Sequence, residues 1–301
     1  MTLDQLRVFV AVAGHLHMTR AAEALHMTQS AVSASVAALE QSCGQRLFDR
    51  VGRHIELTAA GRLMLGEAQA ILKRVGQARD ALADLAGLAR GTLALQASQT
   101  IANYWLAPRM HAFQCHYPNI RLELGIGNTT QVAAAVRDGI ADLGFVEGEV
   151  EEPLIVRRRV QGDELVLVVA ADAPVAADLP ADAPIGAQDL ARMPFVLREP
   201  GSGTRQMFEA ACRRMGLKPA AVTVAFELPS NEAVLSAVAA GAGATVISRL
   251  VADAGLRAGT LKTLPLSLPP RSFYVLHHAE RDRSRAAEAF VDFVCRPQTE
   301  A

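Results

Sequence analysis

Cysteine is scarce in this chain, and none of it forms a metal or disulfide motif. The four cysteines among 301 residues lie far apart, with no Cys-x-x-Cys pair: Cys43, Cys115, Cys212 and Cys295. This spacing excludes the common structural zinc sites and argues against a disulfide framework. We expect reduced thiols, no bound metal and no cofactor.

Long apolar runs are also missing. No stretch approaches the roughly 18 uninterrupted apolar residues of a membrane-spanning helix. Residues 1–12 carry Asp4, Gln5 and Arg7 among apolar residues spaced for a helix, unlike a secretory signal. The sequence therefore predicts a cytoplasmic protein with no membrane partner.

A charge excess of either sign is absent as well. Lys and Arg total 30 against 31 for Asp and Glu, so the formal net charge is −1. Overall charge thus gives no indication of a nucleic-acid partner, and any such indication must come from local arrangement. Apolar residues are abundant instead, at 50%, enough for a core in each of two or three domains.

Residues 1–58 have the pattern of short helices followed by a hairpin. Thr19 is placed to cap a short helix over 20–26, and Thr28 to cap a third helix from Gln29 to about Gln41. The first turns of this third helix offer short polar groups suited to a DNA groove: Thr28, Gln29, Ser30, Ser33 and Ser35. From the helices alone, an ordinary helical hairpin with a polar face is an equal alternative.

The next segment, 47–58, favours DNA binding. It alternates between apolar and polar residues and carries Gly52, as a small β wing would. Arg50 and Arg53 lie in this hairpin, where they can contact backbone phosphate. The two segments together predict a winged helix-turn-helix.

Residues 59–89 contain no proline and predict one helix, about 45 Å long at 1.5 Å per residue. A heptad-like seam follows alternating steps of three and four: Leu65, Ala68, Leu72, Val75, Arg79, Leu82 and Ala86. A solitary helix of this length needs a partner over its seam. A second copy of the chain is the economical candidate.

From Gly91 onward, short apolar runs alternate with amphipathic stretches. The expected strands are Thr92–Leu95, Ile120–Ile126, Asp142–Val146, Glu164–Ala171, Phe195–Arg198, Val222–Glu227, Ala244–Ser248 and Ser272–His277. Helices are expected near 103–115, 130–138, 203–215, 231–240, 249–257 and 284–295. The alternation predicts α/β layers with mostly parallel strands.

Several short motifs follow one another at set distances in the N-terminal part of the chain. They are Leu6-Arg7-Val8-Phe9, Ala21-Ala22-Glu23-Ala24-Leu25, Thr28-Gln29-Ser30-Ala31-Val32-Ser33, Leu39-Glu40, Leu47-Phe48-Asp49-Arg50 and Leu57-Thr58-Ala59-Ala60-Gly61. In order and spacing they resemble the LysR-type transcriptional regulators, and the later α/β pattern agrees over the rest of the chain. The resemblance implies a multidomain α+β and α/β protein: a winged helix-turn-helix, a long linker helix and a two-lobed regulatory domain like periplasmic binding proteins.

The resemblance also implies domain boundaries and partners. The DNA-binding domain is expected at 1–58, the dimerisation helix at 59–89 and the effector-binding domain at 90–301. Crossovers near Val160–Asp163 and Leu264–Leu268 would divide lobe I (91–161 and 267–301) from lobe II (162–266). Implied partners are double-stranded operator DNA, a small-molecule effector, further copies of the chain as dimers and tetramers, and RNA polymerase as a candidate.

Three strand-to-helix loops are placed to supply polar groups to the cleft between these lobes. They contribute Ser98, Thr100, Asn128, Thr129, Gly201, Ser202, Gly203 and Thr204. Hydroxyls and helix N-termini hold anions, so we expect a small anionic effector, as the similarity of the Gly-Ser-Gly-Thr loop to regulators of sulphur assimilation or carbon fixation also indicates. For each single residue, simple N-capping is an equal alternative. Glu147 could also line the cleft, but a solvated loop acid is the favoured interpretation, and Asn231 and Glu232 are treated alike.

One position departs from the family pattern. Many members carry a basic residue after the serine corresponding to Ser33, where this chain has Ala34. Residues 1–58 hold five arginines and five acidic residues, so their net charge is zero. A single DNA-binding domain should therefore bind weakly, and affinity should come from linking several of them.

Two other classes of function fit less well. An enzyme would use Ser202 or Arg205 on a phosphate or carboxylate, but no Ser/His/Asp set, metal cluster or acid pair accompanies them. A solute-binding protein would suit the α/β half but not residues 1–89. The sequence therefore predicts a DNA-binding regulator rather than an enzyme.

Overall fold

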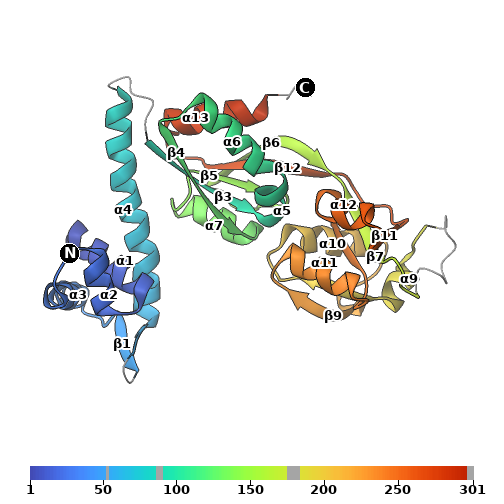
Figure 1. Cartoon of the computed structure of the whole chain (residues 1–301), viewed down its shortest axis with the longest axis horizontal. Helices are drawn as coiled ribbons and strands as arrows, with labels where there is room; N and C mark the ends of the chain where they lie inside the picture. Colours follow the sequence, from blue (N-terminus) through green and yellow to red (C-terminus); the bar gives the residue numbers. More distant parts are fainter. Residues whose placement is uncertain (52–53, 86–90, 175–183, 297–301) are drawn as a thin grey trace. The chain divides into compact units, whose positions relative to one another are not determined.

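The computed structural model describes residues 1–51, 54–85, 91–174 and 184–296. Contacts divide the chain into two compact units, Met1–Leu88 with Asp138–Ile140, and Ala89–Arg137 with Ala141–Ala301 (Figure 1). Within the described ranges, no helix combines the length and apolar character needed to cross a bilayer.

Three helices and a hairpin begin the first unit, and a long helix follows. The elements are α1 (Leu3–His15), α2 (Met18–Ala24), α3 (Gln29–Cys43), the antiparallel pair β1 (Phe48–Val51) and β2 (His54–Leu57), and α4 (Ala59–Leu85). Buried side chains of α1 and α3 share one apolar cluster: Leu6, Phe9, Val12, Val32, Val36 and Leu39. The expected wing is present as this β1–β2 hairpin.

The ends of the short helices follow local hydrogen bonding. Thr28 caps α3 as expected, because its hydroxyl accepts from Ala31 N at 3.2 Å, and Gly44 ends the helix at φ 65°. The prediction that Thr19 caps the second helix is wrong. His17 is the N-cap, since its Nδ1 accepts from Thr19 N at 3.2 Å, so α2 begins two residues earlier than expected.

The first part of α4 packs within its own chain. Ala68 is fully buried in the cluster formed by α1 and α3, and Leu65 and Leu72 pack against that cluster. These residues were expected to face a second copy, but Ala68 is buried within the N-terminal unit, and Leu65 and Leu72 are half-buried against the same cluster. Ala86, at its end, lies outside the described residues.

The second unit contains two α/β lobes, named here by their sheets. Lobe I is built on the order β4-β3-β5-β12-β6, with β3 (Gly91–Ser98), β4 (Ile120–Gly127), β5 (Leu143–Val146), β6 (Ile155–Asp163) and β12 (Arg271–His278). Its helices are α5 (Gln99–Ile101), the π-helical turn η1 (Ala102–Leu106), α6 (Ala107–His116), α7 (Thr129–Arg137) and α13 (Arg285–Cys295).

Lobe II has two strand groups joined by a bridge between Phe195 and Ala244. The strand β7 (Leu165–Ala170) lies between β10 (Thr245–Ser248) and β11 (Leu261–Leu264), and β8 (Pro194–Arg198) pairs with β9 (Thr223–Leu228). Its helices are α9 (Ala187–Arg192), α10 (Gly203–Arg214), the 3₁₀ turn η2 (Pro219–Ala221), α11 (Asn231–Ala239) and α12 (Arg249–Arg257).

The prediction of mostly parallel strands is wrong for the strands next to the crossovers. The strand β3 is parallel to β4 and β5, and β8 to β9. By contrast, β12 is antiparallel to β5 and β6, and β7 to β10 and β11. The reason is the connectivity, because β7 and β12 enter their sheets directly from the other lobe rather than through a helix.

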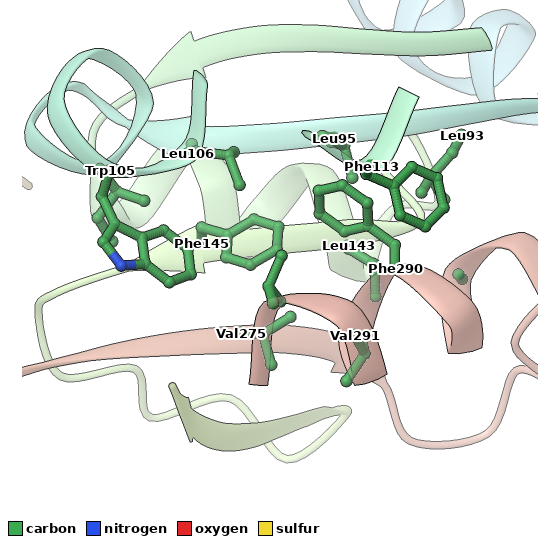
Figure 2. Close-up of a cluster of buried hydrophobic side chains, with 14 of the residues drawn as sticks. Leu93, Leu95, Trp105, Leu106, Phe113, Leu143, Phe145, Val275, Phe290 and Val291 are labelled. Atoms are coloured by element: carbon green, nitrogen blue, oxygen red, sulfur yellow. The ribbon is translucent and has the colours of Figure 1, made fainter. Parts of the chain in front are cut away.

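Aromatic side chains fill the core of lobe I (Figure 2). Trp105 lies 5.9 Å from Phe145 between ring centroids, Phe145 lies 6.0 Å from Phe290, and Phe290 lies 4.9 Å from Phe113. These four rings come from η1, β5, α13 and α6, so they bind the helices on this face to the sheet. A packed core of this kind holds the carboxyl ends of β3, β4 and β5 in place.

Candidate functional site

The first turn of α3 is open to solvent. Thr28, Gln29 and Ser30 are exposed. The Thr28 hydroxyl serves the helix cap and lies 3.1 Å from the Ser30 hydroxyl, whereas the Gln29 amide lies at the exposed start of the helix. A helix start with exposed polar side chains and first-turn amides is the arrangement that contacts base edges and phosphate.

Two further predicted residues of α3 lie beside its buried face. Val32 and Val36 face the core, and Ser33 and Ser35 are half-buried on either side of them. At about 100° per residue these two serines point roughly 160° apart around the helix, so they cannot contact the same edge of a groove. Ser33 lies on the side of Gln29 and Ser30.

The carboxylate of Glu40 connects α3 to the wing. Its Oε1 accepts from Leu47 N at 2.7 Å and from Phe48 N at 3.2 Å. In the wing, Arg50 pairs with Ile55 through the backbone, and Arg53 lies outside the described residues. The recognition helix and the wing are thereby fixed to each other, a relation that sequence reasoning did not find.

The three predicted polar loops meet between the lobes of the second unit. Thr100 Oγ1 of lobe I accepts from Asn231 Nδ2 of lobe II at 3.1 Å. Asn128 Nδ2 donates to Glu199 Oε1 at 3.2 Å, and Thr130 N to Gly201 O at 3.4 Å. The second and third predicted loops are therefore in direct contact, and the first contacts Asn231 of lobe II.

N-capping accounts for only some of these polar residues. Asn128 does cap α7, with its Oδ1 accepting from Gln131 N at 3.0 Å. Ser98 and Ser202 occupy N-cap positions of α5 and α10, but their hydroxyls make no capping hydrogen bond. Thr129, 1% exposed, has a hydroxyl without a hydrogen-bond partner among the described residues. The buried hydroxyls of Ser98, Ser202 and Thr129 therefore do not serve as helix caps.

A buried guanidinium lies next to these hydroxyls. The side chain of Arg271, at the start of β12, is 0% exposed and binds Asp163 through Nε at 2.8 Å and also through Nη2. Its Nη1 donates to Thr204 Oγ1 at 3.1 Å. Sequence reasoning missed Arg271 and Asp163, because only a folded crossover brings these distant residues together.

Glu147 corrects an expectation. It was interpreted as a solvated loop acid, yet it is 5% exposed. Its Oε2 accepts from Ser98 Oγ, and its Oε1 lies 3.6 Å from Arg271 Nη1. Asn231 was treated in the same way and is fully buried, whereas Glu232 is exposed as expected.

A second ion pair lines the lobe II side. Arg198 donates to Glu199 through Nε at 2.8 Å and Nη2 at 3.0 Å, and through Nη1 to Asn231 Oδ1 at 2.6 Å. Burial alone would raise the pKa of Glu199, but the hydrogen bonds and charge of Arg198, with the Asn128 amide, hold it below its ordinary value. Glu199 is therefore an anion at neutral pH.

Glycines allow the loops to come close together. A Cβ on Gly203 would lie 2.8 Å from Gly148 N and 2.7 Å from Thr129 Oγ1. Gly201 has φ +90°, and a Cβ there would lie 3.0 Å from Thr130 Oγ1. The role of the two predicted glycines is therefore to let the backbones of the loops approach each other closely.

Family models match both parts of the chain. Residues 3–62 match the helix-turn-helix described as a bacterial regulatory protein of the lysR family, and residues 86–296 match the LysR substrate binding domain. The chain is 34% identical over 299 residues to the Escherichia coli K12 protein YeiE, called an uncharacterized HTH-type transcriptional regulator. That alignment covers 99% of this chain and 98% of YeiE.

Solved structures show the same fold. Full-length CbnR, complexed with its target DNA, is similar with a TM-score of 0.71 and 23% identity, covering 98% of this chain and 99% of CbnR. The regulatory domain of CcmR from Synechocystis PCC6803, in complex with 2-PG, is similar with a TM-score of 0.61 and 28% identity. It covers 68% of this chain and 95% of that domain.

Proposed function

The chain belongs to the LysR family of DNA-binding transcriptional regulators, and on this premise we propose which of its residues bind operator DNA and what kind of effector it senses. It is a regulator with an effector-binding domain, not an enzyme. The proposal for DNA rests on one observation: the first turn of α3 is exposed and polar.

We infer that Gln29, Ser30 and Ser33 contact base edges, while Thr28 and the first-turn amides of α3 contact phosphate. Ser35 contacts the opposite groove wall, because it projects from the other side of the helix. Arg50 and Arg53 of the wing add phosphate contacts. The assignments on α3 follow its exposure and the side of the helix on which each residue lies.

Gln29→Ala tests the assignment against a matched control, Gln41→Ala, on the exposed last turns of the same helix. Loss of a good side-chain contact to a base costs about 1–3 kcal/mol, so Gln29→Ala should raise the operator Kd by about 5- to 150-fold. Gln41→Ala should leave it unchanged. Footprinting on genomic fragments supplies the operator. Equal affinity of the two variants would refute the role of α3.

We infer further that the effector is a small anion held between the lobes. The hydroxyls of Ser98, Ser202 and Thr129 are buried without serving as helix caps, and Gly203 at the start of α10 lies against Gly148 and Thr129. Thr100, Asn128 and Thr204, with Gly201 and Gly203, complete the surrounding surface. Hydroxyl donors at a helix N-terminus favour negative charge.

Ser202→Ala tests this site against Ser284→Ala. Ser284 does cap its helix, because its Oγ accepts from Ala287 N at 3.2 Å. A thermal-shift screen of anionic metabolites should identify a ligand that stabilises the wild type by about 2.7 kcal/mol at 100 times its Kd. Ser202→Ala should lose this response. Ser284→Ala should lose about 1 kcal/mol of stability but keep the response.

The regulator acts, in this proposal, as linked copies in the cytoplasm. The domains are the winged helix 1–58, the linker helix 59–89 and the regulatory domain 90–301. A neutral DNA-binding domain gains affinity when a second copy raises the local concentration at the neighbouring half-site. Homodimers or homotetramers on an extended site, with RNA polymerase as a further partner, follow from this. Sedimentation analysis with and without operator DNA measures the assembly.

A further inference from the structure

Two carboxylates surround one buried guanidinium between the lobes. Arg271 is neutralised by Asp163, which contacts it through both Nε and Nη2 and also accepts from Ser248 Oγ at 3.0 Å. Glu147 is the second carboxylate, and its distance of 3.6 Å from Arg271 Nη1 is longer than a hydrogen bond. The set Arg271, Asp163 and Glu147 therefore carries one surplus negative charge in a buried place.

The hydroxyl of Ser98 holds the Glu147 carboxylate in place. The Glu147 side chain is 4% exposed, and its Oε2 accepts from the hydroxyl of Ser98. Ser98 is one of the hydroxyls that makes no helix cap, and it ends β3 at the carboxyl edge of the lobe I sheet. The Nη1 of Arg271 also donates to Thr204, at the start of α10 in lobe II. Glu147 thus lies among the donors of both lobes.

We propose that the Glu147 carboxylate is an internal anion that occupies the place of the effector and must move out for the effector to bind. This rests on the anionic effector proposed above. Ser98 has one hydroxyl proton, so it cannot donate to Glu147 and to a ligand oxygen at once. A second anion beside Glu147 would also meet repulsion, since Asp163 already neutralises Arg271.

In consequence, an anion binds in the cleft only if its affinity is high enough to displace Glu147. The effector is a small oxyanion able to replace a carboxylate between Ser98 and Arg271. Displacing Glu147 breaks its contact with Ser98 and removes its charge from beside Arg271 Nη1, which donates to Thr204 of lobe II. Binding of the anion is thereby coupled to the contacts between the lobes. A residue with a purely structural role would instead lower stability when changed, without favouring anions.

Glu147→Gln separates these roles in the full-length protein. The amide oxygen still accepts from Ser98, but the charge is gone. Calorimetric titration with inorganic phosphate, sulfate, sulfite and small carboxylates should give a Kd about tenfold lower, or lower still, than in the wild type. Glu149→Gln, an exposed acid two residues away, is the control for general charge and should change the Kd little.

A second variant and a direct measurement guard against misfolding of the first. Glu147→Ala leaves room for the anion and should also bind more tightly than the wild type. In a wild-type crystal grown with the strongest anion, Glu147 should have left Ser98. If both Glu147 variants bind an anion and the wild type binds none, that result also supports the proposal.

Four outcomes overturn it. Wild-type binding that equals or exceeds that of both Glu147 variants refutes the internal anion while leaving the anionic effector intact. A gain in anion affinity in Glu149→Gln equal to that in Glu147→Gln also refutes the internal anion. So does a crystal structure in which the anion is bound while Glu147 still accepts from Ser98. If the wild type and both variants bind none of the anions, the anionic effector itself falls with the proposal.

Discussion

Gly203 of α10 and Gly148 after β5 lie in close backbone contact. A Cβ placed on Gly203 would lie 2.8 Å from Gly148 N, and a Cβ placed on Gly148 would lie 2.9 Å from Gly203 Cα. The two residues belong to different lobes of the second unit. Their backbones are in contact because neither carries a side chain. The lobes can approach at this point only with glycine on both sides.

Gly203→Ala should therefore hold the lobes apart. The added methyl group forces Gly148 and Thr129 to shift, at a cost of about 1–3 kcal/mol. We expect a lower free energy of unfolding and weaker anion binding. Gly186→Ala is the control, since a Cβ there meets only Asp189 Oδ2 at 3.6 Å. Unchanged stability and anion affinity in Gly203→Ala would contradict the close approach.

A second glycine ties the wing to the long helix. A Cβ on Gly61 would lie 2.0 Å from the carbonyl oxygen of Leu47, so Gly61→Ala must displace the start of the wing. We expect a loss of about 1–3 kcal/mol from the N-terminal unit and weaker operator binding.

Gly66→Ala in the same helix is the matched control for Gly61→Ala, because a Cβ there meets nothing within 4 Å. It should raise stability by up to about 1 kcal/mol through helix propensity. Denaturant titration of both variants measures the difference. If Gly61→Ala were as stable as Gly66→Ala, the packing of Gly61 on Leu47 would be wrong.

The pair Arg198–Glu199 predicts a pH dependence. Because the pKa of Glu199 is lowered in the folded state, the pair stabilises the protein above the unfolded pKa of about 4.3. This stability disappears as the pH falls through the lower, folded pKa. Glu199→Gln should cost on the order of 1 kcal/mol at pH 7, and its difference from wild type should shrink as the pH falls.

Glu164→Gln provides the comparison for Glu199→Gln. Its ion pair with Arg249, at 3.4 Å, is between exposed side chains and should contribute little at any pH. Urea titrations of the wild type, Glu199→Gln and Glu164→Gln between about pH 3 and 7 measure the free energy of unfolding over roughly the range in which carboxylates titrate. A Glu199→Gln difference that does not depend on pH would exclude the ion pair as its cause.

Cys212 should be inert to thiol reagents in the native protein. Burial, and then the charge of Glu209, raises the pKa of its thiol to about 11, and the residue is 0% exposed. Cys115 is exposed and serves as the internal control. With a disulfide reagent near neutral pH, peptide mapping should find Cys115 labelled and Cys212 labelled only after unfolding. Native labelling of Cys212 at the rate of Cys115 would contradict this.

The sequence by itself determined the local elements and the family. Thr28 and Gly44 delimit α3 because a cap needs only its neighbours along the chain, and apolar residues at helical spacing identified the buried face of that helix. The strand ends at Ser98, Asn128 and Arg198 were recognisable in the same way, since an apolar run followed by polar residues marks a strand and its loop. Strand β6 escaped, because its exposed Arg157, Arg158 and Arg159 give no apolar pattern.

Only the tertiary structure decided how the loops are used. Arg271 and Asp163 are 108 residues apart, and Ser98 and Glu147 are 49 apart, so no periodicity relates them. Glu147 looks like a solvated acid in the sequence, because burial depends on what the second lobe places against it. Capping and helix packing are local and leave a signal in the order of residues, whereas the charge balance of a cleft exists only once distant segments enclose it.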